Sequence, residues 1–144
     1  MTSEESYTFS SLMNYLVEIE ETVALFYRDA AGKIVNSELS DLFHLFMREH
    51  LDAKKEIKDA GRRSITEFTL EPLRIPGLQR YCEEIRSIMD SEEYRDVEKA
   101  KLLEETLSEL LRVISQKVMV ISPNAGLLLN KLSRRCSSRL NMLK

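Results

Sequence analysis

The most constraining feature of this 144-residue sequence is that four long segments repeat apolar residues at the spacing of an amphipathic α-helix. The segments span residues 8–32, 36–61, 91–118 and 122–143, and only a few residues separate the first from the second and the third from the fourth. A short link between two helices makes them antiparallel neighbours. The sequence therefore predicts two helical hairpins.

Residues that start and stop helices stand at the ends of these segments. Each expected start has a side chain that can accept a hydrogen bond from the first helical turn; these residues are Thr8 or Ser10, Asn36 or Ser37, Ser91 or Asp96, and Ser122. Pro123 follows directly and suits the first turn of a helix. Gly32 and Gly61 are expected to end the first two helices.

A long connection separates the two hairpins. Residues 62–76 contain Pro72, Pro76 and the β-prone stretch ITEFTL, and we expect irregular structure there, whereas GLQRYCEEIRSIMD indicates a short helix. Hairpin, long crossover, hairpin is the order found in ferritin-like folds. The predicted fold is thus all-α: a ferritin-like four-helix bundle of two hairpins joined by a long crossover with a short helix, in one domain over residues 1–144.

Composition and charge argue against several classes of protein. The net charge of −3 has its signs interspersed, which does not favour a nucleic-acid surface, although the C-terminal end is locally basic. The apolar runs are too short to cross a membrane, and the polar, acidic start does not resemble a signal peptide, so we expect a cytoplasmic protein. Cys82 and Cys136 lie too far apart in sequence for a rubredoxin-type or zinc-ribbon site.

Acidic residues occupy apolar stripes of the predicted helices. Glu20 has apolar neighbours at helical spacing, and a carboxylate buried there must be paired, protonated or bound to a metal. Glu20 lies twelve residues before Gly32, and Glu49 lies twelve residues after Ser37, so the hairpin places both at the same depth. Asp52 follows one turn later on the same face.

The second hairpin repeats this pattern with substitutions. Glu104 stands among leucines much as Glu20 stands among its apolar neighbours. On the returning helix, Cys136 and Arg139 take the positions that correspond to Glu49 and Asp52. The chain therefore reads as two degenerate copies of one hairpin.

Over most of its length the chain resembles the rubrerythrin branch of the ferritin-like superfamily. Glu20 precedes Phe26-Tyr27 by six residues, and Glu104 precedes Leu110-Leu111 by the same number. The family's Leu-Ala-x-x-Glu-x-x-His pattern is matched by LFMREHLD (45–52) and LSRRCSSR (132–139). The resemblance implies a non-haem di-iron centre of four glutamates and two histidines.

This sequence departs from the family pattern at three of those six positions. Asp52 and Arg139 stand where the family has histidine, and Cys136 stands where it has a glutamate. The metal-ligand candidates that remain are Glu20, Glu49, Asp52 and Glu104. The guanidinium of Arg139 would repel a metal ion and is expected to pair with Glu104 or Glu20 instead.

Two residues leave alternatives open. His50 would reach the site if the register shifts by one residue, at the expense of Glu49, and the depth match favours Glu49. Cys136 is either a reactive thiol, because Arg135 and Arg139 would favour the thiolate, or a small core residue.

Two functions are compatible with these patterns. The first is a metal-free ferritin-like domain that acts as a non-catalytic structural or interaction protein, and the family resemblance implies a homodimer. The alternative is a rubrerythrin-type non-haem iron oxidoreductase that handles peroxide or oxygen, or a metal-binding protein with an atypical carboxylate site. The expected cofactor is accordingly none, or iron or manganese. Whether the chain is an enzyme is left open, and neither a nucleic acid nor a membrane is an expected partner.

Overall fold

The structure, a computed structural model, describes residues 6–63 and 72–144, and most of these residues are helical. Within them the chain forms five helices and two very short strands. The helices are α1 (Phe9–Lys33), α2 (Ser37–Arg63), α3 (Leu78–Asp90), α4 (Asp96–Val118) and α5 (Pro123–Met142). The strands are β1 (Ser6–Tyr7) and β2 (Leu73–Arg74).

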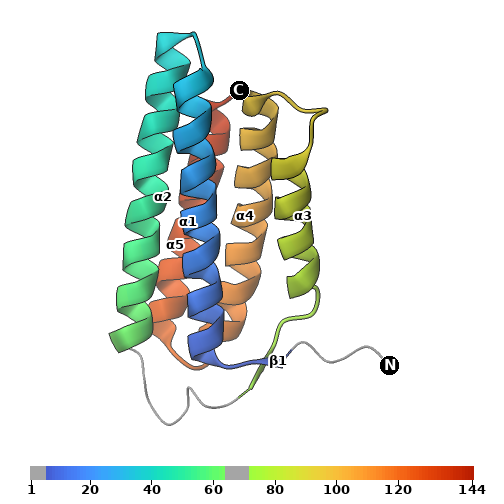
Figure 1. Cartoon of the computed structure of the whole chain (residues 1–144). Helices are drawn as coiled ribbons and strands as arrows, with labels where there is room; N and C mark the ends of the chain where they lie inside the picture. Colours follow the sequence, from blue (N-terminus) through green and yellow to red (C-terminus); the bar gives the residue numbers. More distant parts are fainter. Residues whose placement is uncertain (1–5, 64–71) are drawn as a thin grey trace.

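The four long helices lie side by side with their axes nearly aligned (Figure 1). α1 packs along α2 and α4 packs along α5, and the two pairs meet where α2 contacts α5 and α1 contacts α4. α1 and α5 run in one direction, and α2 and α4 run in the other (Figure 1). The shorter helix α3 packs on the outer side of α4. Two closely linked antiparallel pairs are therefore present, as the sequence predicts.

Local capping explains where the helices begin. The side-chain oxygens of Thr8, Asn36 and Ser122 each accept a hydrogen bond from the backbone N–H three residues later, at the starts of α1, α2 and α5. The expected helix ends at Gly32 and Gly61 are wrong by one and two residues. Neither glycine has a positive φ, so neither adopts the left-handed conformation that stops a helix.

A small sheet departs from the all-α expectation. β1 pairs antiparallel with β2, with Ser6 opposite Arg74 and Tyr7 opposite Leu73. Strands of two residues are too short to show an alternating apolar pattern, so the sequence gives no sign of them. The β-prone stretch ITEFTL lies outside the described residues.

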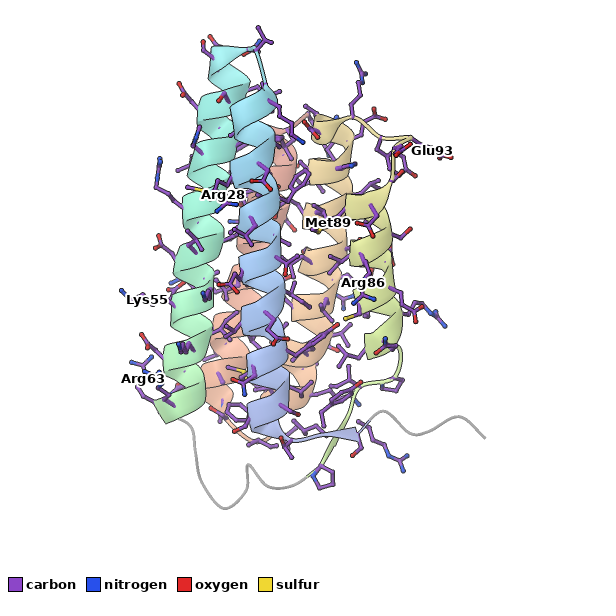
Figure 2. The ribbon with its side chains drawn as sticks, viewed as in Figure 1. Arg28, Lys55, Arg63, Arg86, Met89 and Glu93 are labelled. Atoms are coloured by element: carbon purple, nitrogen blue, oxygen red, sulfur yellow. The ribbon has the colours of Figure 1, made fainter. Side chains whose placement is uncertain are left out.

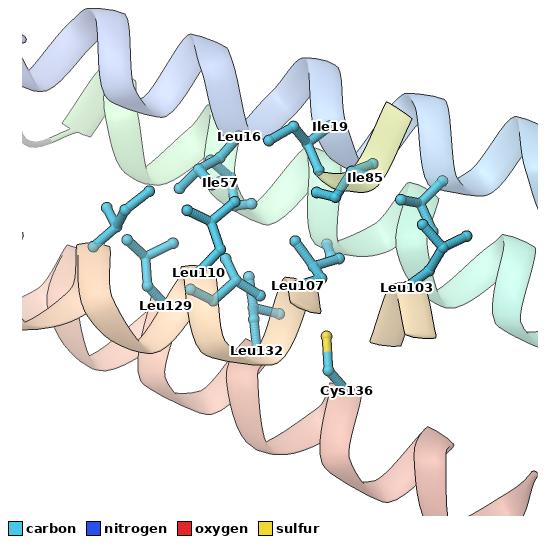
Figure 3. Close-up of a cluster of buried hydrophobic side chains, with 14 of the residues drawn as sticks. Leu16, Ile19, Ile57, Ile85, Leu103, Leu107, Leu110, Leu129, Leu132 and Cys136 are labelled. Atoms are coloured by element: carbon cyan, nitrogen blue, oxygen red, sulfur yellow. The ribbon is translucent and has the colours of Figure 1, made fainter. Parts of the chain in front are cut away.

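One apolar core runs between the helices. Figure 3 shows its middle, where leucine and isoleucine side chains from several helices meet, with Cys136 pointing into the same core from α5. The buried ring of Tyr27 makes edge contacts with Phe43 at 5.0 Å and Phe46 at 5.5 Å between centroids. No helix in the described ranges is both long and apolar enough to cross a membrane.

Two glycines of this fold should respond in opposite ways to replacement by alanine. A Cβ at Gly126 would lie 2.8 Å from the backbone Cα of Met119, whereas a Cβ at Gly32 meets nothing within 4 Å. We expect Gly126→Ala to lower the free energy of unfolding by about 1–3 kcal/mol through overpacking. Gly32→Ala should raise it by about 0.5 kcal/mol, because alanine restricts the unfolded chain. Urea unfolding of both variants tests this, and equal effects would contradict it.

Candidate functional site

Polar side chains from four helices meet inside the apolar core. Glu20 of α1, His50 of α2, Glu104 of α4 and Arg139 of α5 are all nearly inaccessible to solvent. We call these residues, with three neighbours that bond or stack on them, the central network. Its members are Glu20, Tyr27, Glu49, His50, Glu104, Cys136 and Arg139.

His50 bridges two carboxylates. Its Nδ1 lies 2.5 Å from Glu20 Oε1, and its Nε2 lies 2.8 Å from Glu104 Oε2. Both ring nitrogens of a histidine can donate only when the imidazole is protonated. Burial alone would lower the pKa of His50, but the two carboxylates outweigh it and raise the pKa to about 9. His50 is therefore a buried cation at neutral pH.

Arg139 supplies a second cation beside Glu104. Its Nε donates to Glu104 Oε1 at 3.0 Å, its Nη1 donates to Glu49 Oε1 at 2.9 Å, and its Nη2 donates to Cys136 Sγ at 3.3 Å. Burial opposes the charge of the guanidinium, but Glu104 more than compensates and raises the pKa of Arg139. The predicted pairing of Arg139 with Glu104 is confirmed.

Glu104 accepts hydrogen bonds from three members of the network. One of its oxygens accepts from Arg139, and the other accepts from His50 and from the hydroxyl of Tyr27, at 2.6 Å. Burial would raise the pKa of Glu104, but these donors outweigh it and lower the pKa to about 2. The Tyr27 ring also stacks on the His50 ring, with centroids 5.5 Å apart. Glu104 thus remains a carboxylate despite complete burial.

Only one of the two carboxylate oxygens of Glu20 has a hydrogen-bond partner among the described residues. Its Oε1 pairs with His50, but its Oε2 is buried and has no hydrogen-bond partner in the part of the chain that the structure describes. An unmet buried acceptor of this kind costs about 1–3 kcal/mol, and more when it is charged.

The four predicted metal ligands do not converge on one point. Glu20 and Glu104 lie at the centre of the network, whereas the side chain of Glu49 is 39% exposed and accepts a hydrogen bond from Arg139. Asp52 is exposed and lines an outer groove between α2 and α5. Among the described residues, no group of three or more His, Cys, Asp and Glu side chains is placed to hold a metal ion. Metal binding by these residues stays a prediction.

The preference for Glu49 over His50 as the central residue is wrong. The depth comparison assumed that α1 stops at Gly32, but α1 continues to Lys33. Glu20 lies thirteen residues before Lys33, and the residue thirteen positions after Ser37 is His50. His50, and not Glu49, is therefore the residue of α2 at the same depth as Glu20. Both residues contact the network, and only His50 is fully buried.

Cys136 is a core residue. It is completely buried, and burial together with the nearby Glu104 raises the pKa of its thiol well above the usual value. The reactive-thiol alternative is therefore wrong for this conformation, because only the thiolate is strongly nucleophilic. Tyr27 lies two helical turns after Glu20 on the same face of α1, a position consistent with the hydrogen bond that it donates to Glu104.

Comparison of the chain with protein-family models, curated proteins and solved structures finds no match. The chemistry of the central network is therefore the observation on which a function has to be argued. The arrangement neutralises buried carboxylates with protein cations, and the shifted pKa values of His50 and Glu104 keep these two groups charged around neutral pH.

The raised pKa of His50 predicts how stability depends on pH. The pKa rises from 6.5 in the unfolded chain to about 9 in the folded protein, so the stabilisation is complete below 6.5 and is lost as the pH rises through 9. We expect the free energy of unfolding to fall by about 3 kcal/mol between about pH 6 and pH 9.5. Urea unfolding followed by circular dichroism measures it.

The matched variant is His50→Gln, which keeps hydrogen-bonding capacity but cannot titrate. Its free energy of unfolding should change much less over the same pH interval. A wild-type protein with a flat profile, or a variant with the same slope as wild type, would contradict the assigned charge state of His50.

Proposed function

We propose that this protein is a ferritin-like four-helix bundle of the rubrerythrin type in which the central network takes the place of a di-iron centre, and that it works as a non-catalytic structural or interaction protein. The observation that carries the proposal is the pairing of Arg139 with Glu104 and Glu49 in the core. A guanidinium stands where the resemblance would place a metal ligand.

The order and direction of the helices support the fold part of this proposal. Two antiparallel pairs are joined by a long connection that contains α3. The first helix of the second pair, α4, runs antiparallel to the first helix of the first pair, α1. One long crossover between two hairpins is the connectivity of ferritin-like bundles.

Electrostatics supports the metal-free part of the proposal. Three carboxylates in the network face two protein cations, His50 and Arg139, so most of the charge that a metal would neutralise is already balanced. A divalent ion about 5 Å from a guanidinium would be repelled by about 7 kcal/mol at an effective dielectric constant of about 20. Binding would require Arg139 to leave a pocket in which its side chain is 4% exposed.

One observation favours the alternative, a metal-dependent oxidoreductase. Glu20 and Glu104, from two helices, both contact His50 of a third helix in the core, although in the observed arrangement the three side chains are not placed to hold a metal ion. For a hard metal to use them, His50 would have to lose its proton and release one of its two carboxylates. The two candidates therefore differ in metal content.

Metal analysis of protein purified from cells grown with added iron and manganese separates them. We expect well below one metal ion per chain by inductively coupled plasma mass spectrometry. About two iron ions per chain, the content of a carboxylate di-iron bundle, would overturn the proposal if they are lost in Glu49→Ala.

Replacement of Arg139 tests its structural role. Arg139→Ala leaves Glu104 without one of its buried cations, and we expect the free energy of unfolding to fall by about 3–5 kcal/mol. Arg135→Ala is the matched control. Arg135 lies one turn before Arg139 on α5 and pairs with Glu56 of α2, but its side chain is 41% exposed. This variant should lower the free energy of unfolding by at most about 1 kcal/mol. Equal losses would contradict a special role for Arg139. If Arg139→Ala does not fold, Arg139→Lys should fold with an intermediate loss.

A further inference from the structure

One end of the bundle gathers positive charge. The start of α1, the end of α2 and the turn between α4 and α5 lie together there (Figure 1). We call it the basic end and define it as the seven residues of each long helix nearest to it, about two turns, together with the turn 119–122. Among these described residues every charged side chain is exposed, and five cations stand against one acid: Lys58, Arg62, Arg63, Arg112 and Lys117 against Asp59.

The opposite end of the same helices has no such excess. The same definition gives five acids and five cations there, namely Asp29, Glu38, Asp41, Asp96 and Glu98, and Arg28, Lys33, Lys99, Lys101 and Arg139. Figure 2 shows Arg63 at the basic end and Glu93 far from it, in the connection between α3 and α4. The net charge of −3 for the whole chain therefore conceals one positive end.

The last quarter of the sequence accounts for part of this asymmetry. No aspartate or glutamate follows Glu109, whereas residues 110–144 contain seven lysines and arginines. The end of α4, the turn after it and α5 therefore bring no acidic side chain to the basic end.

Two aliphatic side chains are exposed at the basic end. Val120, in the turn between α4 and α5, is 86% exposed, and Leu127 of α5 is 57% exposed. They are neighbours because the turn packs on α5, where a Cβ at Gly126 would lie 2.8 Å from the Cα of Met119. Lys117 precedes Val120 by three residues and is also exposed. The turn thus presents an apolar tip beside a cation.

Charge and shape together indicate which partner fits. Each lysine or arginine close to a membrane with anionic lipids raises the affinity about fivefold. A nucleic acid would satisfy the cations but would place its phosphates against Val120. A folded acidic protein would need a cavity shaped for Val120 and Leu127, whereas an apolar side chain can enter the boundary between lipid headgroups and acyl chains. These features favour a lipid surface.

We propose that the basic end docks on the surface of a membrane that contains anionic lipids. Val120 and Leu127 enter the headgroup region, and the five cations face the anionic headgroups. The contact is peripheral. The short apolar runs of the sequence bear on membrane-spanning segments and not on a contact of this kind. The proposal goes beyond the function proposed above and does not depend on the metal content of the central network.

Sedimentation of the whole protein with lipid vesicles tests the docking. One set of vesicles contains only phosphatidylcholine, and the other contains about 30% phosphatidylserine, so the two sets differ in surface charge. We expect partitioning to the anionic set to be at least about tenfold stronger. It should weaken at least about tenfold between about 0.1 M and about 0.5 M salt, because salt screens the cations. Equal partitioning to both sets, or none to either, would overturn the proposal.

Val120→Asp and Val35→Asp form a matched pair. Val35 is 99% exposed in the turn between α1 and α2, at the opposite end. Both changes add one negative charge to an exposed turn, and both variants should keep the circular dichroism spectrum of the wild type. Val120→Asp should weaken partitioning to the anionic vesicles at least about tenfold, and Val35→Asp should stay within about twofold of wild type. Equal losses would contradict the assigned orientation.

Three further variants separate a lipid surface from a nucleic acid. Val120→Ser removes the apolar tip without adding charge and should weaken vesicle partitioning at least about threefold. Lys117→Gln should weaken it about fivefold, and Lys33→Gln, at the opposite end, should leave it unchanged. Unaltered partitioning of Val120→Ser would overturn the proposal. Displacement of the wild type from the vesicles by an equal mass of a short DNA duplex would overturn it in favour of a nucleic acid.

Discussion

The interior of this protein depends on the neutralisation of Glu104. A carboxylate with no exposed surface loses several kcal/mol of hydration, and only good hydrogen-bonding geometry compensates for it. The compensating donors come from three different helices: Tyr27 from α1, His50 from α2 and Arg139 from α5. Because Glu104 itself belongs to α4, this single carboxylate connects all four long helices. Its charge requires them to be at one relative height.

The apolar core and the central network therefore have different roles. Burial of leucine and isoleucine side chains supplies most of the stabilisation, at about 1.5–3 kcal/mol for each fully buried side chain. Such contacts are not directional, and a helix displaced by one turn still buries leucines, since α4 and α5 repeat them. Hydrogen bonds to Glu104 do not tolerate that displacement. Several helix registers would bury similar apolar area, and the polar residues are suited to favouring the one register in which their hydrogen bonds form. Buried polar groups have this role in some other helical proteins.

Local features were predictable from sequence and non-local ones were predictable only in part. The capped starts at Thr8, Asn36 and Ser122 follow from side chains that act on the next turn. The pair of Arg139 and Glu104 follows from helical register across a short link. His50 was misjudged because a helix end uncertain by one residue changes which neighbour faces the core. The β1–β2 sheet joins segments far apart in sequence, and nothing local in two residues reports such a pairing.

A network neutralised by protein side chains differs chemically from one neutralised by a metal. A guanidinium neither changes oxidation state nor loses its proton at any physiological pH. The pKa values of Glu104, about 2, and His50, about 9, place both titrations away from neutrality, and burial keeps Tyr27 and Cys136 protonated. Under the proposed function, these four groups at the centre of the protein therefore each keep one protonation state near neutral pH.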